Sequence, residues 1–383
     1  MVATIAQIHL HPSVLPKLCA ILNWTNTNPN EPECHLAPIA SWADRVRRSP
    51  GYGWTGPLHY VEGKDDYPSE TCAFPGDRGW VNGPVNLLNA IVNVTHTLEE
   101  WDGKVEEVGS RTNEALKFLV HFYGDLHMPL HTAGRERGGN GIKVTFDGRH
   151  TSEYPPLSDE SLSPIPMIDL HSLWDGLLIA QRLRTLPRNY TLPLLNRHIE
   201  YNLRGTIYDP YVRRVMWEGI FGMWKDEVQQ WLSCPSPELS AVGNGGMWQT
   251  VLSMFKRNVA AETDDDLICP YAWAKPINAM NCDFIFPKAL DEHPFSERYH
   301  DPNHSGHAMC AKHEAQSAAT DELKEQPPYL ELDTPEYSGK IRDEFIVEKL
   351  IAQGGIRLAG VLNYLFADED AGDICGQLWV PTV

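Results

Sequence analysis

The stretch HFYGDLHMPLH, residues 121–131, places three histidines and one aspartate close together in the chain. A helix expected over 110–128 puts His121 and Asp125 on one face, because residues four apart in a helix are neighbours. Pro129 ends that helix, so His131 can fold back toward the same face. Imidazole and carboxylate are ligands that suit zinc at catalytic sites, and the stretch therefore predicts a metal site.

A second His-x3-Asp pair, His171 and Asp175 in HSLWD, has the same helical spacing. One such pair is usually a surface or capping pair. Two pairs, with a further histidine after a helix-ending proline, favour a metal site. Asp44 in SWADRVRR is followed three residues later by Arg47, so both side chains can point into one cleft. His59 in PLHY comes at the start of a long loop and is another candidate.

His127 belongs to the same stretch but is six residues from His121, which places it on another face of the helix. We interpret it as a histidine that supports the site from outside or lies on the surface.

The bulk composition indicates a globular chain and limits what it can bind. Of 383 residues, 42% are hydrophobic and 22% are charged. No apolar run approaches the roughly 20 residues that cross a bilayer, so no membrane insertion is expected. The formal net charge of −19 excludes a general cationic surface for nucleic acid. Any phosphate must be held locally, by metal ions or a few placed arginines.

The cysteines and glycosylation sequons favour secretion. Eight cysteines without a CxxC pair fit disulfides in an oxidising compartment, although sequence alone leaves their pairing open. Three sequons begin at Asn93, Asn189 and Asn303. The chain opens MVATIAQIHLHPSVLPKL, which contains no signal peptide, and we expect the natural start to lie upstream.

Hydrophobic periodicity and breaker residues predict a mostly α chain. Residues 49–85 form a long loop, and IKVTF (142–146) a short strand. Residues 149–168 and 291–328 have loop composition and are interpreted as insertions. We expect one domain over 1–367 with a tail at 368–383. The expected helices cover 1–22, 38–48, 84–101, 110–128, 169–186, 191–203, 212–233, 246–262 and 340–367.

Seven segments, in order along the chain, resemble the S1/P1 nuclease family, which comprises zinc-dependent single-strand nucleases sharing the fold of bacterial phospholipase C. They are SWAD (41–44), LHYVEG (58–63), ALKFLVHFYGDLHMPLH (115–131), GGNGIKVTFDG (138–148), LHSLWD (170–175), WAKPINAMNC (273–282) and IAQGGIRLAGVLN (351–363). The insertions and the tail have no clear counterpart in short family members. The resemblance implies a single-domain helical bundle with long loops and a short β-hairpin.

The resemblance also implies three zinc ions per chain. The ligands of the first zinc, and the carboxylate that bridges it to a close neighbour, are matched by Asp44, His59, His121 and Asp125. The ligands of the third, more separated zinc are matched by His131, His171 and Asp175. In the family an N-terminal Trp-Gly-x-x-Gly-His completes the neighbouring zinc. Here ATIAQ (3–7) matches the family residues that come directly after that histidine, so two or fewer zinc ions are expected for this chain.

Other positions match family residues that contact substrate or fix the loop. Arg47 corresponds to a basic residue on the scissile phosphate, and Tyr60 to a residue that stacks on a base. Glu62 corresponds to a residue that hydrogen-bonds the base edge, and Asn140 of the GGN motif is assigned to substrate binding. The resemblance pairs two cysteines in a disulfide, Cys72 and Cys282.

The implied function is a secreted endonuclease and 3′-nucleotidase acting on single-stranded DNA and RNA. Zinc-bound hydroxide would attack the phosphorus, the departing 3′ oxygen would be stabilised by zinc, and a 5′-phosphate would remain. One alternative is a phospholipase C-like activity on lipid head groups, although 49–85 supplies no clear apolar rim. Another is a non-catalytic binding protein on the same scaffold. A helical HD-type phosphohydrolase is disfavoured, because the sole His-Asp dipeptide is His300-Asp301. No obligate protein partner is expected.

Overall fold

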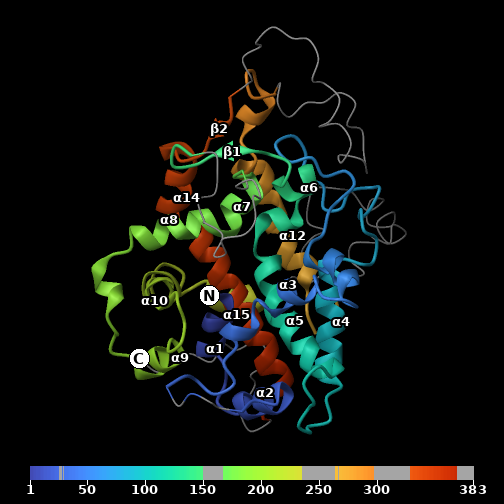
Figure 1. Ribbon diagram of the computed structural model, residues 1–383, viewed down its shortest axis with the longest axis vertical. Helices are drawn as coiled ribbons and strands as arrows, with labels where there is room; N and C mark the ends of the chain where they lie inside the picture. Colours follow the sequence, from blue (N-terminus) through green and yellow to red (C-terminus); the bar gives the residue numbers. More distant parts are fainter. Residues whose placement is uncertain are drawn as a thin grey trace, which may run out of the picture.

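The computed structural model describes residues 1–25, 28, 30–149, 167–234, 264–265, 267–296 and 328–368. Helices make up most of this part of the chain, and the expected mostly α fold is confirmed (Figure 1). The expected helix at 246–262, most of both expected insertions and almost all of the expected tail lie outside the described residues. No helix of the described part is long and apolar enough to cross a bilayer.

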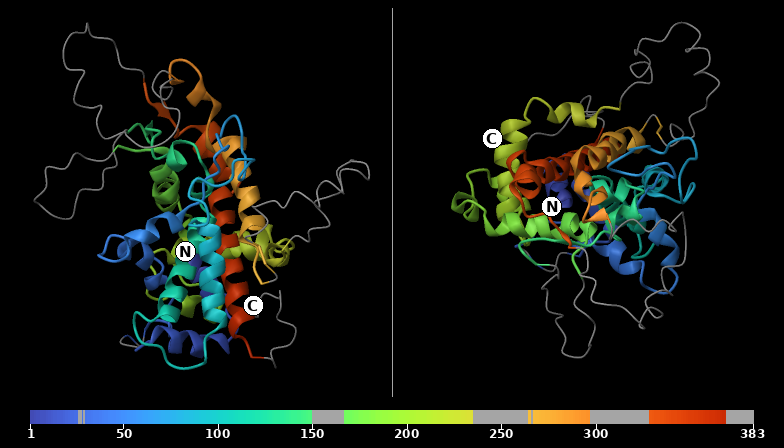
Figure 2. Two further views of the ribbon diagram at one scale, coloured as in Figure 1. Left: turned by 90° about the vertical axis from the view of Figure 1, so that its right-hand side faces the viewer. Right: turned by 90° about the horizontal axis from the view of Figure 1, so that it is seen from above.

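Three long helices form the centre: α4 (Leu87–Glu99), α5 (Arg111–Leu126) and α15 (Ile346–Phe366). They run along the long axis of the molecule (Figures 1 and 2), and α5 packs against both of the others. The side chain of Ser110 caps α5 by accepting a hydrogen bond from the backbone N–H of Asn113. Because the buried face of α5 is fixed between its neighbours, the residues at its C-terminal end have a defined direction.

The first helix, α1 (Val2–Ile8), packs against α15 in the interior. Gly355 permits this contact, because a Cβ there would lie 2.6 Å from the side chain of Ile5. The helix expected over 1–22 is in fact two helices, and α2 (Val14–Leu22) begins after a break that contains Pro12. Proline lacks the backbone N–H that a continuous helix needs.

The remaining elements are short, and several expected helices are divided. The 38–48 region holds η1 (Ala37–Ile39) and α3 (Trp42–Val46). α12 (Pro270–Met280), which has Pro276 inside it, was not among the expected helices. The other elements are η2 (Gly53–His59), η3 (Pro129–Thr132), α6 (Glu136–Gly139), α7 (Leu170–Ser172), η4 (Leu173–Leu177), α8 (Leu178–Arg184), η5 (Arg188–Thr191), α9 (Arg197–Asn202), α10 (Asp209–Arg214), η6 (Val215–Met223), η7 (Val228–Leu232), η10 (Asn281–Ile285), η11 (Lys288–Asp291), η12 (Pro335–Gly339) and α14 (Lys340–Asp343).

Among the described residues, the strands do not form the expected β-hairpin. β1 (Val144–Thr145) pairs in parallel with β2 (Leu330–Glu331), which comes from a distant part of the chain. Parallel strands require a long crossover, so a tight turn cannot join them. The turn after β1 forms one isolated antiparallel bridge, between Phe146 and Arg149.

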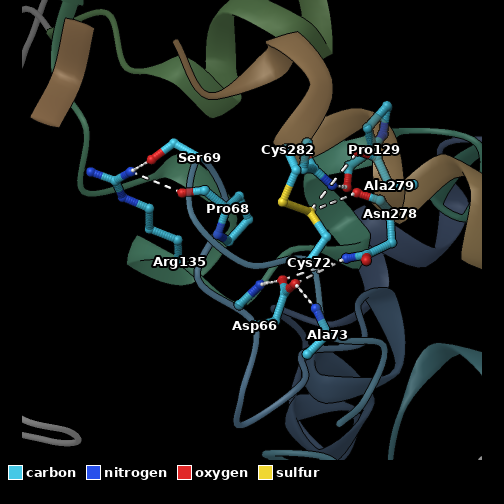
Figure 3. The surroundings of a disulfide bond; sticks show 12 residues. Asp66, Pro68, Ser69, Cys72, Ala73, Pro129, Arg135, Asn278, Ala279 and Cys282 are labelled. Atoms are coloured by element: carbon cyan, nitrogen blue, oxygen red, sulfur yellow. Dashed lines mark hydrogen bonds between the residues drawn. A yellow bond between two sulfur atoms is a disulfide. The ribbon is translucent and has the colours of Figure 1, made fainter. Parts of the chain in front are cut away.

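A disulfide between Cys72 and Cys282 fastens the long loop to η10, which directly follows α12 (Figure 3). Beneath it, the buried carboxylate of Asp66 accepts hydrogen bonds from the backbone N–H groups of Ala73 and Gly134. Burial raises the pKa of Asp66 to about 6, and these donors lower it only in part. The part of the long loop that follows the predicted ligand His59 is therefore anchored by a disulfide and by hydrogen bonds.

Two further disulfides and two sequons lie in the described part. Cys19 pairs with Cys34 and Cys234 with Cys269, whereas Cys310 and Cys375 lie outside it. Among the sequons, Asn93 on α4 and Asn189 on η5 are exposed, and Asn303 lies outside the described residues.

Candidate metal centre

Three elements bring the first group of candidate ligands together. α3 carries Asp44, η2 ends with His59, and α5 carries His121. One ligand atom from each lies within 4.8 Å of the others. The Nε2 atom of His121 is 3.7 Å from Asp44 Oδ2 and 3.1 Å from His59 Nδ1. We refer to these three residues as the first group.

A second group consists of His131, His171 and Asp175, whose ligand atoms also lie within 4.8 Å of one another. His131 follows the end of α5 on η3, as the proline-ended helix predicts. The Nε2 atoms of His131 and His171 are 3.8 Å and 3.3 Å from the carboxylate of Asp175.

A wide π-helical turn shapes the second group. The sequence predicts one helix over 169–186, but η4 is π-helical and lies between α7 and α8. His171 belongs to α7 and Asp175 to η4, so the pair spans the start of this turn. Single π-turns inside helices are frequent at functional sites.

Asp125 contacts both groups. Its Oδ2 atom is 2.9 Å from His59 Nδ1 and 3.2 Å from His121 Nε2, and its Oδ1 atom is 3.6 Å from His131 Nδ1. Only 8% of the surface of Asp125 is exposed, so its carboxylate lies beneath the two groups and not on the protein surface. One carboxylate therefore connects the two sets of imidazoles.

Backbone carbonyls fix three of the imidazole rings. The Nδ1–H of His121 donates to the carbonyl oxygen of Ala40 at 2.6 Å. The Nδ1–H of His131 donates to that of His59 at 2.5 Å, and the Nδ1–H of His171 to that of Gly138 at 2.8 Å. Each of these rings thereby turns its Nε2 atom toward the group. Metal-bound histidines characteristically donate their other nitrogen in this way, which fixes tautomer and ring direction.

Gly138 has a specific reason to be glycine. Its φ is +63°, and a Cβ there would lie 2.3 Å from the carbonyl oxygen of Leu130. Only glycine adopts this backbone freely. The GGN motif therefore places the carbonyl that orients His171.

The electrostatics of the groups also suit a cation. Burial of His121 lowers its pKa, but the carboxylates of Asp125 and Asp44 outweigh burial and raise that pKa to about 9. Burial raises the pKa of Asp125, yet His121 and His131 hold it well below its usual range. Four imidazoles around three carboxylates, with three Nε2 atoms oriented by carbonyls, match the nitrogen and oxygen donors that zinc takes. The residues present therefore fit a metal.

Metal binding is expected to release a proton. Because its pKa is about 9, the His121 side chain is a doubly protonated imidazolium at pH 7. A metal that binds Nε2 must displace the proton on that nitrogen. We expect release of about one proton per chain at pH 7, and zinc affinity that rises about tenfold per pH unit below pH 9. Calorimetry in two buffers of different ionisation enthalpy measures the proton count. Zinc binding without proton release between pH 6 and 8 would contradict this assignment.

The residues assigned to substrate binding fall into two pairs, of which one lines a cavity at the second group and the other does not. Arg47 Nη2 is 3.4 Å from Asp44 Oδ1, and both Arg47 and Asn140 line one cavity with His171 and Asp175. Tyr60 and Glu62 do not line that cavity; they follow His59 on the anchored loop. Burial raises the pKa of Glu62 to about 7, with Arg137 opposing the rise and Asp66 adding to it.

Some features of the site have no clear sequence signal. The carbonyls of Ala40 and Gly138 are backbone groups, which residue identity does not reveal. His127 is a buried packing residue, not a surface residue: its Nδ1–H donates to Tyr123 O, and its Nε2 accepts from Arg357. Its spacing from His121 does predict that it is no ligand.

Comparisons with known proteins show what the chain is similar to. The family model described as S1/P1 Nuclease matches residues 1–316. Nuclease S1 of Aspergillus oryzae is 34% identical over 141 residues, covering 37% of this chain and 41% of that protein. Nuclease P1 of Penicillium citrinum is 33% identical over 175 residues, covering 46% and 60%. Endonuclease 4 of Arabidopsis thaliana is 29% identical over 347 residues, covering 89% and 80%. The chain thus spans less than two thirds of each fungal nuclease.

Proposed function

Because the chain belongs to the S1/P1 nuclease family, we propose that it is a zinc-dependent phosphodiesterase. Its proposed substrates are single-stranded DNA and RNA, cut to 5′-phosphate products, and 3′-nucleotides. The observation that carries this proposal is the contact of one buried carboxylate, Asp125, with imidazoles of both groups. The three disulfides are compatible with the secreted location that we propose. We also propose that residues 1–367 form one domain.

The two groups would hold two zinc ions, one each. Asp44, His59 and His121 would bind one, with Asp125 beside them, and His131, His171 and Asp175 would bind another. When bound, zinc supplies a nucleophilic hydroxide at neutral pH and neutralises charge on phosphate oxygens. The protein contributes the fixed donor positions, through carbonyl-oriented rings on packed helices.

Arg47 is suited to the scissile phosphate. Its guanidinium is half-buried beside Asp44, on the wall of the cavity that contains His171 and Asp175. From there it can donate hydrogen bonds to a phosphoryl oxygen and offset the charge that develops in the transition state. The net charge of −19 is compatible with this local arrangement, because cations are needed only where the phosphate binds.

Tyr60 and Glu62 are suited to a nucleobase. Tyr60 is half-buried, and its pKa is raised by burial and by the neighbouring charge of Glu62. With a pKa of about 7, the Glu62 carboxyl is protonated below neutral pH and can then donate to a base edge. Above that pH it can only accept.

Replacing Tyr60 with alanine should raise KM for oligonucleotides more than it lowers kcat. Loss of one base stack costs roughly 1–3 kcal/mol, which corresponds to about 5- to 150-fold in affinity. Steady-state kinetics on a short single-stranded oligonucleotide, with Tyr60→Phe as the stacking-competent control, measures the difference. Equal kcat/KM in Tyr60→Ala and parent would count against base stacking here.

Turnover on competing substrates tests the proposed function. We expect the zinc-loaded chain to hydrolyse single-stranded DNA and to leave phosphatidylcholine essentially unchanged. The reverse preference would favour the phospholipase C-like alternative. Hydrolysis of neither, together with failure to bind zinc at both groups, would favour a non-catalytic binding protein.

A further inference from the structure

Another cavity lies between α12 and α15 and is separate from the metal ligands. Its volume is about 270 Å³, and none of its lining residues belongs to either group of ligands. The two helices run side by side in both views of Figure 2. Each presents residues three and four apart to the cavity, as one face of a helix requires. These residues include Trp273, Ile277 and Met280 on α12, and Leu350, Gln353 and Arg357 on α15.

Arg357 lines this cavity although only 7% of its surface is exposed. Its Nε–H donates to the carbonyl oxygen of Trp231 at 2.9 Å, and one Nη1–H donates to His127 Nε2 at 2.7 Å. The guanidinium also lies over the ring of Trp273, 5.2 Å from the ring centroid. These hydrogen bonds use two of the five N–H groups of an arginine, and neither acceptor carries a negative charge.

The positive charge of Arg357 has no counter-charge in the described part of the chain. Glu227 pairs with Lys349 of the cavity lining at 2.7 Å, and Glu348, also on α15, pairs with Arg182 at 3.3 Å. Burial lowers the pKa of Arg357 to about 10, so the guanidinium is still charged at neutral pH. Because a buried cation without an anion is unfavourable, an anion that enters the cavity would be bound favourably.

The rest of the lining favours an apolar ligand with a single negative charge. Trp273, Ile277 and Leu350 are buried and apolar. Glu344 is exposed at the edge of the cavity and would repel a second negative charge. The volume is just below the roughly 300–1,000 Å³ of sites for drug-sized ligands, which limits the occupant to a small molecule.

We propose that this cavity binds a small amphipathic monocarboxylate, whose carboxylate accepts hydrogen bonds from Arg357 and whose apolar body packs against Trp273 and Leu350. The unused N–H groups of Arg357 are on Nη1 and Nη2, the pair that can hold both oxygens of a carboxylate. A phosphate monoester fits less well, because it carries nearly two negative charges at pH 7 and Glu344 lines the edge. The inference uses no metal ligand, so it does not depend on the proposed nuclease function.

Calorimetry on the zinc-loaded protein with three probes tests both parts of the ligand. Octanoate has the charge and the apolar body, octan-1-ol lacks the charge, and acetate lacks the body. We expect octanoate to bind with a Kd of about 1 mM or tighter, and each of the other two to bind at least about tenfold more weakly. Acetate also measures any binding of a carboxylate to zinc. Octanoate affinity no greater than that of octan-1-ol or of acetate would overturn the proposal.

Two variants locate the bound octanoate. Arg357→Gln removes the charge, and Gln353→Trp fills the cavity while Arg357 stays in place; each should weaken octanoate binding at least about tenfold. Lys275→Trp is the matched control, because Lys275 is an exposed residue of α12 outside the lining, and it should keep the parent affinity. If Arg357→Gln does not fold, Gln353→Trp decides alone. Parent affinity in folded Gln353→Trp, or an equal loss in Lys275→Trp, would place octanoate elsewhere and overturn the site.

Discussion

Replacing Asp125 with asparagine should abolish hydrolysis of single-stranded DNA, with a fall in kcat/KM of roughly 10³-fold or more. Asparagine keeps the shape but removes the negative charge that contacts His59, His121 and His131. The variant would then place His59 Nδ1 and His121 Nε2, 3.1 Å apart, beside a neutral amide. Zinc should bind the first group more weakly, since an anionic ligand is lost.

Kinetics and zinc titration of the Asp125→Asn variant measure both effects. Asp283→Asn is a suitable control, because Asp283 is exposed and belongs to neither group. It should retain parent activity and zinc affinity. Full activity in Asp125→Asn would reject Asp125 as the carboxylate that connects the groups.

Removing metal with a chelator should eliminate activity and destabilise the fold. Without a cation, the carboxylates and imidazoles of both groups lose the ligand that would hold them together. Zinc at a free concentration a thousandfold above its Kd stabilises a protein by about 4 kcal/mol. Thermal unfolding should therefore occur at a lower temperature in the chelated protein, and zinc should restore both stability and activity.

Magnesium is the informative control for this experiment. It prefers oxygen ligands in octahedral geometry, whereas the two groups contain four imidazoles. We expect magnesium to restore neither activity nor thermal stability. Full activity after exhaustive chelation, or equal rescue by magnesium, would argue against zinc at these groups.

Helix geometry explains why so much of the site could be predicted from the sequence. The His-x3-Asp spacing requires only that 110–128 and 169–186 be helical, and a helix places such pairs on one face. Pro129 ends the helix, because proline lacks a backbone N–H and clashes with the preceding turn, and the chain can then bring His131 back toward the same face. These inferences depend on a few neighbouring residues, so they hold although helix boundaries differ.

Features that depend on distant parts of the chain could not be predicted in this way. β2 pairs with β1 across about half of the chain, and no local pattern in IKVTF indicates a parallel partner. α12 tolerates Pro276 because tertiary packing outweighs the local cost of proline.

The most direct test is diffraction at the zinc absorption edge from crystals of the zinc-saturated protein. We predict one anomalous peak bounded by Asp44, His59 and His121, and another bounded by His131, His171 and Asp175, with Asp125 in contact with the first. Zinc bound elsewhere, with both groups empty at saturating zinc, would contradict the assignment of these side chains as metal ligands.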